Sequence, residues 1–147
     1  MVELGNVQSN TWLGRRWSEW LVLNIVLQRG YGPPHQPGVY RIRDARVSDS
    51  LLYIGESNDL RGRLFQLRNA MEKVAKGGKQ GPPHWAGASI LHHQRQGAVI
   101  EVSWLLDAVN DEGERKGIEC ECIAAHRWLL KSNPACQFIA LGRRNTA

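Results

Sequence analysis

Hydrophobic and polar positions alternate between helical and strand-like spacing along this chain. Residues 11–28 carry apolar side chains at helical intervals until Gly30, which predicts a helix there. The segment at 30–37 is rich in glycine and proline and predicts a loop. Two short β-prone runs follow at 38–43 and 51–55, with a polar turn between them, so we expect an antiparallel hairpin.

The rest of the chain predicts three helices and further strands. After Ser57-Asn58-Asp59, which suits a helix cap, a stripe of apolar residues predicts a helix that ends at Gly77-Gly78. The stripe consists of Leu60, Leu64, Leu67, Met71 and Val74. Later elements are a short helix at 86–95, a strand at 98–106, a helix at 112–131 and a short closing strand at 137–141.

These elements predict an α+β fold, with a small three-stranded antiparallel sheet flanked by helices. The glycine- and proline-rich loop divides the chain into two parts. Residues 1–36 would form an N-terminal tail, helix and loop, a helical appendage to a main domain at residues 37–147. A length of 147 residues fits one domain with such an appendage.

Composition and charge narrow the functional classes. Hydrophobic residues make up 42% of the chain and charged residues 22%, as in ordinary globular proteins. The apolar run at 21–27 is too short for a membrane span and lacks a small-residue cleavage site, so we expect a cytoplasmic protein with no membrane partner. A net charge of +5 favours a polyanionic partner.

Common catalytic motifs and metal-ligand patterns are missing from the sequence. The glycine-rich phosphate loop, the zinc-protease helix and the hydrolase nucleophile elbow do not occur. Three cysteines, Cys120, Cys122 and Cys136, cannot all pair, so we expect reduced thiols. His126 lies four residues after Cys122, but further zinc ligands are missing.

Two tripeptides on the predicted hairpin carry the specific signal. Gly38-Val39-Tyr40 lies on the first strand and Tyr53-Ile54-Gly55 on the second, and an Asp-Leu-Arg-Gly-Arg run at 59–63 opens the next helix. In this order and spacing the motifs resemble the GIY-YIG nuclease family, over residues 37–138. The family includes homing, restriction and excision-repair endonucleases. The resemblance implies a metal-dependent endonuclease that hydrolyses phosphodiester bonds in DNA.

The resemblance also implies which residues form the site. Tyr40 and Tyr53 match the two functional tyrosines of the family. Arg61 and Arg63 flank opposite sides of the apolar stripe, so periodicity does not choose between them. The family places its catalytic arginine ten residues after the second tyrosine, at Arg63, which leaves Arg61 as an expected phosphate contact.

A glutamate is the implied metal ligand. The family pattern is Glu four residues before the Ile of a Leu-Ile pair, which Glu119 matches through Ile123, although Cys122 replaces Leu. Glu121 is the alternative. One carboxylate with waters and a phosphate oxygen suits Mg²⁺, or Mn²⁺ in its place.

The chain departs from the family pattern at three further positions. Gln137 stands three residues after Pro134, where the family has Asn, and is expected to keep its supporting role. Glu56 replaces a Lys of some members, and Leu67 replaces a His of others. The general base must then be a deprotonated tyrosine or a metal-bound hydroxide, and Tyr40 is the first candidate.

Further residues are expected around the site. His126 lies two helical turns after Glu119 and is a candidate supporting residue, although a core-edge role is the simpler interpretation. His84-Trp85 belongs either to a DNA-facing loop or to packing. The cations expected to contact the DNA backbone are Arg61, Arg68, Lys73, Lys76 and Lys79.

Two questions of function stay open at this stage. The alternative to an enzyme is a module on the same fold that binds DNA or a protein without cutting. One site cuts one strand at a time, so a double-strand break would need a homodimer, a partner domain or two successive events.

Overall fold

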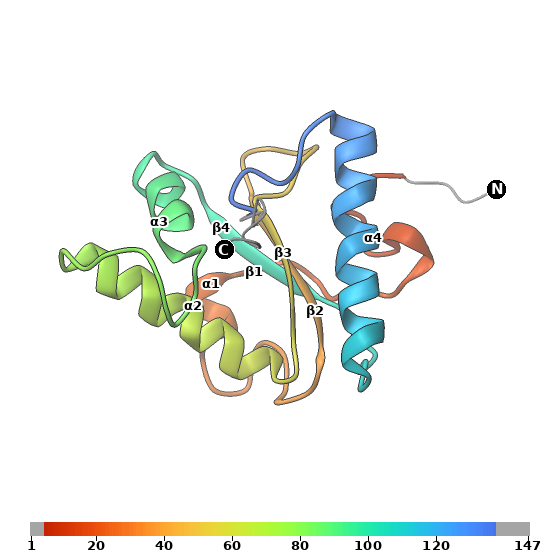
Figure 1. Ribbon diagram of the computed structural model, residues 1–147, viewed down its shortest axis with the longest axis horizontal. Helices are drawn as coiled ribbons and strands as arrows, with labels where there is room; N and C mark the ends of the chain where they lie inside the picture. The colour runs from red at the N-terminus through yellow and green to blue at the C-terminus, as the bar shows by residue number, and fades with distance from the viewer. Residues whose placement is uncertain (1–4, 138–147) are drawn as a thin grey trace.

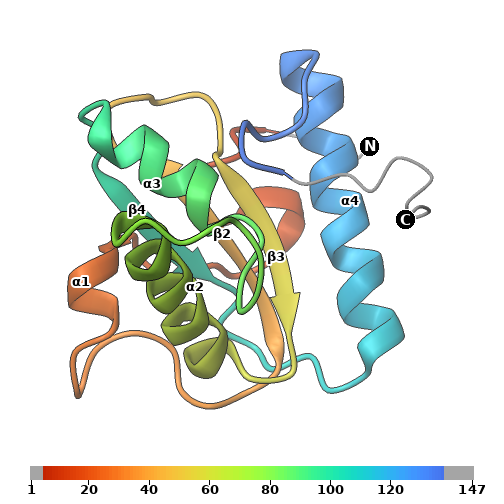
Figure 2. The ribbon, with the colours of Figure 1, turned by 60° about the vertical axis from the view of Figure 1, so that its left-hand side comes forward.

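An antiparallel sheet in the order β1-β4-β2-β3 organises the computed structural model, which describes residues 5–137. Helices α2 and α3 lie on one side of the sheet and α4 lies on the other (Figures 1 and 2). The predicted α+β class is confirmed, with four strands in the described sheet instead of three. The strands are β1 (Leu21–Val22), β2 (Gly38–Asp44), β3 (Tyr53–Ser57) and β4 (Ile100–Trp104). The helices are the 3-10 turn η1 (Trp12–Gly14), α1 (Leu23–Val26), α2 (Leu60–Ala75), α3 (Gly87–Arg95) and α4 (Glu112–Leu130).

Strand β2 is the middle of the fold. It pairs with β3 on one edge, where Tyr40 lies opposite Gly55, and with β4 on the other. Because successive side chains point to opposite faces, Tyr40 and Ile42 enter the hydrophobic core beneath α2 and α3. Val39 enters a second core, beneath α4. The predicted hairpin is therefore confirmed, and both of its faces are buried.

The two long helices begin where capping chemistry predicts. The Asp59 carboxylate accepts the backbone N–H of Gly62 at 3.0 Å and caps α2. The Asp111 carboxylate caps α4 in the same way, at 2.8 Å from the backbone nitrogen of Glu114. Leu60, the first residue of α2, is fully buried against the sheet. The predicted helices after residue 59 are thus present, and their bounds shift by one or two residues.

The predicted helix at 11–28 is wrong. This segment forms η1, the short strand β1 and the single turn of α1. Leu21 and Val22 pair with β4, and the Ser18 backbone N–H donates to the Trp104 carbonyl at 2.7 Å. The edge of β4 offers unpaired backbone groups, and satisfying them outweighs the helical spacing of the apolar residues.

Tryptophans of the N-terminal segment surround a buried arginine on β2. The Arg41 guanidinium lies over the rings of Trp17 and Trp20, at 4.3 and 4.6 Å from their centroids. It also donates to the Val7 carbonyl at 2.6 Å. Residues on both sides of the predicted boundary after residue 36 therefore share one sheet and one core, and the division into two parts stays a prediction.

Two further expectations concern the ends of the chain and the membrane. Of the predicted closing strand at 137–141, only Gln137 lies within the described residues, and it is not in a strand. None of the helices between residues 5 and 137 is both long and apolar enough to cross a membrane.

The contacts of Arg41 with Trp17, Trp20 and the Val7 carbonyl should contribute strongly to stability. We expect Arg41→Ala to lower the free energy of unfolding by about 3 kcal/mol, because it leaves a cavity between indole rings and an unpaired carbonyl. Arg41→Met fills most of that volume and should cost about 1 kcal/mol less. Urea denaturation followed by tryptophan fluorescence measures both, and an Arg41→Ala variant as stable as the parent would contradict the assignment.

Candidate active site

The two motif tyrosines lie side by side on neighbouring strands. Tyr40 and Tyr53 face the α2 side of the sheet, with ring centroids 6.0 Å apart. The Tyr40 ring crosses directly over Gly55, where a Cβ would stand 2.6 Å from the tyrosine oxygen. Glycine in the second tripeptide is thus a requirement for placing the tyrosine of the first. Tyr40 is fully buried, whereas Tyr53 keeps some exposure.

A histidine from the loop between α2 and α3 completes the tyrosine pair. The His84 Nε2 atom lies 2.8 Å from the Tyr40 hydroxyl, and His84 is almost fully buried. The backbone N–H of Ala86 donates to His84 Nδ1 at 3.2 Å, so Nδ1 carries no proton. Burial and the charge of Arg63 lower the pKa of His84 to about 3. The neutral ring therefore donates from Nε2 to the Tyr40 oxygen.

The sequence places His84 either in a DNA-facing loop or in packing, and it does not assign His84 to the tyrosine pair. Its one local signal is the Pro82-Pro83 pair before it, which predicts a loop but not the side of the protein that the loop covers.

Arg63 joins the tyrosines from the first turn of α2. Its Nη1 atom donates to the Pro83 carbonyl at 2.9 Å and to Gln66 at 2.8 Å. Burial raises the pKa of Tyr40 well above its ordinary value and also raises the pKa of Tyr53. The charge and hydrogen bonding of Arg63 act in the opposite direction on both hydroxyls. The guanidinium is therefore close to both tyrosines.

Glu119 reaches the same cluster from α4. Burial and the nearby charge of Glu56 raise the pKa of the Glu119 carboxyl to about 7. The Glu56 backbone N–H and the charges of Lys116 and Arg63 act against this rise. Glu119 in turn raises the pKa of Tyr53. Four side chains from β2, β3, α2 and α4 thus meet in one place.

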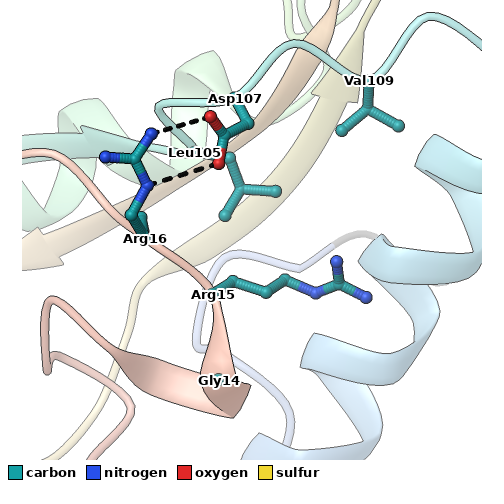
Figure 3. Close-up of a pocket in the computed structure, with 6 residues that line it drawn as sticks. All are labelled: Gly14, Arg15, Arg16, Leu105, Asp107 and Val109. Carbon is teal, nitrogen blue, oxygen red and sulfur yellow. Dashed lines mark hydrogen bonds and ion pairs between the residues drawn. The ribbon is translucent and has the colours of Figure 1, made fainter.

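The alternative glutamate lies elsewhere. Glu121 is exposed and pairs with Arg15 at 3.4 Å. Figure 3 shows Arg15 extending from the N-terminal segment toward α4, beside a pocket in which Arg16 pairs with Asp107. The structure brings Glu119 to the tyrosines and directs Glu121 to the N-terminal segment.

An open polar pocket of about 400 Å³ borders the cluster at Arg63. Glu56 lines it and is held by Arg115, with a nitrogen–oxygen distance of 2.9 Å. The other lining residues are Ser57, Asn58, Gln66 and Glu112. Within residues 5–137, no three side chains of His, Cys, Asp or Glu gather as a metal-binding group.

The partners of Arg61 in the structure differ from the phosphate that the sequence suggested. Its guanidinium donates to backbone carbonyls at the end of α1 and in the loop that follows. The shortest bonds run to Tyr31 at 2.7 Å and Gln28 at 3.0 Å. These bonds tie the first turn of α2 to the backbone after α1, so the geometry indicates that Arg61 anchors the loop.

Two predicted supporting residues hold the edge strand. The side-chain amide of Gln137 accepts from the Ile54 N–H at 3.0 Å and donates to the Ile54 carbonyl at 2.8 Å. His126 accepts from the Leu51 N–H at 3.0 Å and donates to the Ser132 carbonyl at 2.7 Å. Gln137 thereby fixes β3 next to Tyr53. His126 ties α4 to the loop before β3 and does not bridge to Glu119.

The remaining predicted cations lie along α2 and beyond its end. Arg68 packs on Phe65 and lies 3.8 Å from Glu72. Lys73 donates to the Pro82 carbonyl at 3.1 Å. Lys76 and Lys79 are exposed. Of these side chains, Lys73 contacts the loop that carries His84, whereas Arg68 lines a pocket with Leu23 and Asn24.

Comparison with known proteins finds similarity to UvrC proteins and their endonuclease domains. Solved structures of the GIY-YIG N-terminal endonuclease domain of UvrC from Thermotoga maritima are similar to this chain, and they are point mutants described as bound to a catalytic divalent cation. One is 21% identical, with 72% of this chain and 87% of that domain covered and a TM-score of 0.44. A second is 20% identical, with 79% and 93% covered and a TM-score of 0.45.

Among curated proteins, UvrABC system protein C from Haemophilus ducreyi is 31% identical over 75 residues. The match covers 49% of this chain and 12% of that protein's length. No protein-family model matches the chain. The chain is similar to GIY-YIG endonuclease domains. The resemblance expected from the two tripeptides is therefore confirmed.

Arg61 and Arg63 of α2 should differ in their effect on stability. We expect Arg61→Ala to lower the free energy of unfolding by about 2–4 kcal/mol, because several carbonyls lose their donor. Arg61→Lys should recover only part, since an ammonium cannot bridge them all. Arg63→Ala, the matched control, should cost less than about 1 kcal/mol. Equal losses in chemical denaturation would overturn the anchoring role.

Glu119 should destabilise the metal-free fold at high pH. Its folded pKa of about 7 exceeds the ordinary 4.5, so stability falls as pH rises through this window and stays low above it. Glu119→Gln removes the charge, and we expect a gain of about 1–2 kcal/mol at pH 8, after solvent screening, and almost none at pH 4.

Urea denaturation in chelator at the two pH values measures this effect. Glu121→Gln, on an exposed side chain, is the control and should change stability little at either pH. A gain for Glu119→Gln that does not depend on pH would contradict the electrostatic cause.

Proposed function

We propose that this chain is a GIY-YIG-type endonuclease that hydrolyses phosphodiester bonds in DNA with a divalent cation. The observation that carries the proposal is the convergence of Tyr40, Tyr53, Arg63 and Glu119 from four separate elements. These are the residues that the motif resemblance selects. The net charge of +5 suits a DNA backbone.

Glu119 fits the role of metal ligand. It offers hard oxygen donors at a partly exposed position, and the nearby Glu56 makes its charge costly without a cation. Such a site suits Mg²⁺ or Mn²⁺, which binds few carboxylates and keeps several waters. When bound, the cation would polarise a phosphoryl oxygen and lower the pKa of a coordinated water.

Tyr53, in its deprotonated form, is the better placed of the two tyrosines to accept a proton from the attacking water. Tyr40, the first candidate from the sequence, is fully buried, and its oxygen already accepts from His84. Tyr53 is partly exposed, and Arg63 and the Tyr40 hydroxyl both lower its pKa against the effect of burial. We therefore assign Tyr40 and His84 to positioning and Tyr53 to proton transfer.

Arg63 stabilises the negative charge that develops on the phosphate during the reaction. Its Nη1 atom is fixed by the Pro83 carbonyl, which leaves other donors of the guanidinium fork near the tyrosine hydroxyls. A fork held in this way can grip two oxygens of a pentavalent transition state at little cost in reorganisation. Lysine would keep the charge and lose that geometry.

The decisive experiment is cleavage of supercoiled plasmid with Mg²⁺ or Mn²⁺. We expect the parent chain to nick DNA and Arg63→Lys to slow single-turnover cleavage roughly 100- to 1,000-fold, because a preorganised donor to the transition state is lost. Glu119→Gln should abolish cleavage and leave DNA affinity in chelator nearly unchanged.

Glu121→Gln is the matched control on the same helix and should cleave within a few fold of the parent. Binding without cleavage at any metal concentration would instead support the non-catalytic binding module. Greater loss with Glu121→Gln than with Glu119→Gln would show that the metal ligand is misassigned.

A further inference from the structure

We propose that Trp85 is a stacking platform for an unpaired DNA base next to the scissile phosphate, so that the preferred substrate is DNA with an unstacked nucleotide. The inference rests on the proposed function and specifies its substrate. Trp85 follows His84 directly and is 50% exposed, whereas its neighbours His84 and Ala86 are buried.

The loop that presents Trp85 is held firmly. Each of the residues 82–85 makes a hydrogen bond that fixes it. Lys73 donates to the Pro82 carbonyl at 3.1 Å, Arg63 to the Pro83 carbonyl at 2.9 Å, and Gln80 to the Trp85 carbonyl at 2.8 Å. His84 is bound to Tyr40 at 2.8 Å. The loop is therefore held at a fixed position relative to the site, and little backbone entropy is lost when Trp85 binds a ligand.

The stretch of sequence that contains Trp85 favours a polyanion. From residue 73 to residue 100 the chain contains no Asp or Glu. The same stretch contains three lysines and an arginine: Lys73, Lys76, Lys79 and Arg95. A large exposed aromatic ring in a basic stretch has the composition of a single-strand binding surface, in which cations follow the backbone and rings stack on bases.

An unpaired base is the ligand that this geometry accepts. Bases in an intact duplex are already stacked on their neighbours and do not offer a face to a side chain. A bulged, mismatched or single-stranded nucleotide does offer one. Because Trp85 adjoins the residue bound to Tyr40, a base on its ring would lie close to the phosphate that Arg63 and Glu119 act on.

The test uses the full chain and DNA with 2-aminopurine at a single unpaired position, in chelator so that nothing is cut. We expect the parent to quench the 2-aminopurine fluorescence on binding and to prefer this DNA over the fully paired duplex. Trp85→Ala should remove the quenching and weaken binding to the unpaired DNA about tenfold to a hundredfold, with duplex affinity unchanged. Trp85→Phe should keep part of both effects.

Trp128→Ala is the matched control, because Trp128 is 69% exposed on α4, across the sheet from α2 and α3. It should behave as the parent. Equal loss of affinity for paired and unpaired DNA with Trp85→Ala, or unchanged quenching, would overturn the proposal and leave Trp85 a packing residue. Quenching by a protein that never cleaves would support the stacking site and reject the nuclease function.

Discussion

The alternation of side chains along β2, with both faces of the strand buried, is the constraint on which this fold depends. It sends Tyr40 toward α2 and α3 and Arg41 toward the N-terminal tryptophans. A slip of one residue in register would bring a guanidinium to the face that now buries the Tyr40 hydroxyl, and a hydroxyl to the face that now buries Arg41. The N-terminal segment, which binds Arg41, and the candidate site, which contains Tyr40, therefore stabilise the same strand position from opposite sides.

Close approach of chain segments then assembles the site. Gly55 admits the Tyr40 ring, and the clamp of Gln137 on Ile54 fixes the outer edge of β3. Arg61 and Arg63, two residues apart on α2, receive different tasks because one meets the loop after α1 and the other meets the loop with Pro83. Neither partner is close to the arginines in sequence.

The electrostatics of the cluster favour the binding of a charged ligand over the stability of the free chain. Glu119 is held partly buried near Glu56, and Tyr40 and Tyr53 are protonated more firmly than free tyrosines. Arg63 offsets only part of these costs. A cation and a phosphate would complete the charge balance that the chain alone leaves unfinished, which is a common property of functional sites.

The sequence by itself determined the hairpin and the three later helices, because strand alternation and capping are local properties. Its resemblance to the GIY-YIG family proposed Tyr40, Tyr53 and Arg63 as site residues. It did not determine the N-terminal segment, where pairing with β4 outweighed the helical spacing of the apolar residues. Nor did it assign His84, which reaches Tyr40 only because the loop between α2 and α3 folds back over the sheet. The anchoring by Arg61 was likewise decided by the tertiary structure. Glu119 was already proposed over Glu121 from the family pattern, and its place beside the tyrosines supports that proposal. For the N-terminal segment, His84 and Arg61, the deciding partner lies dozens of residues away, where local periodicity carries no information.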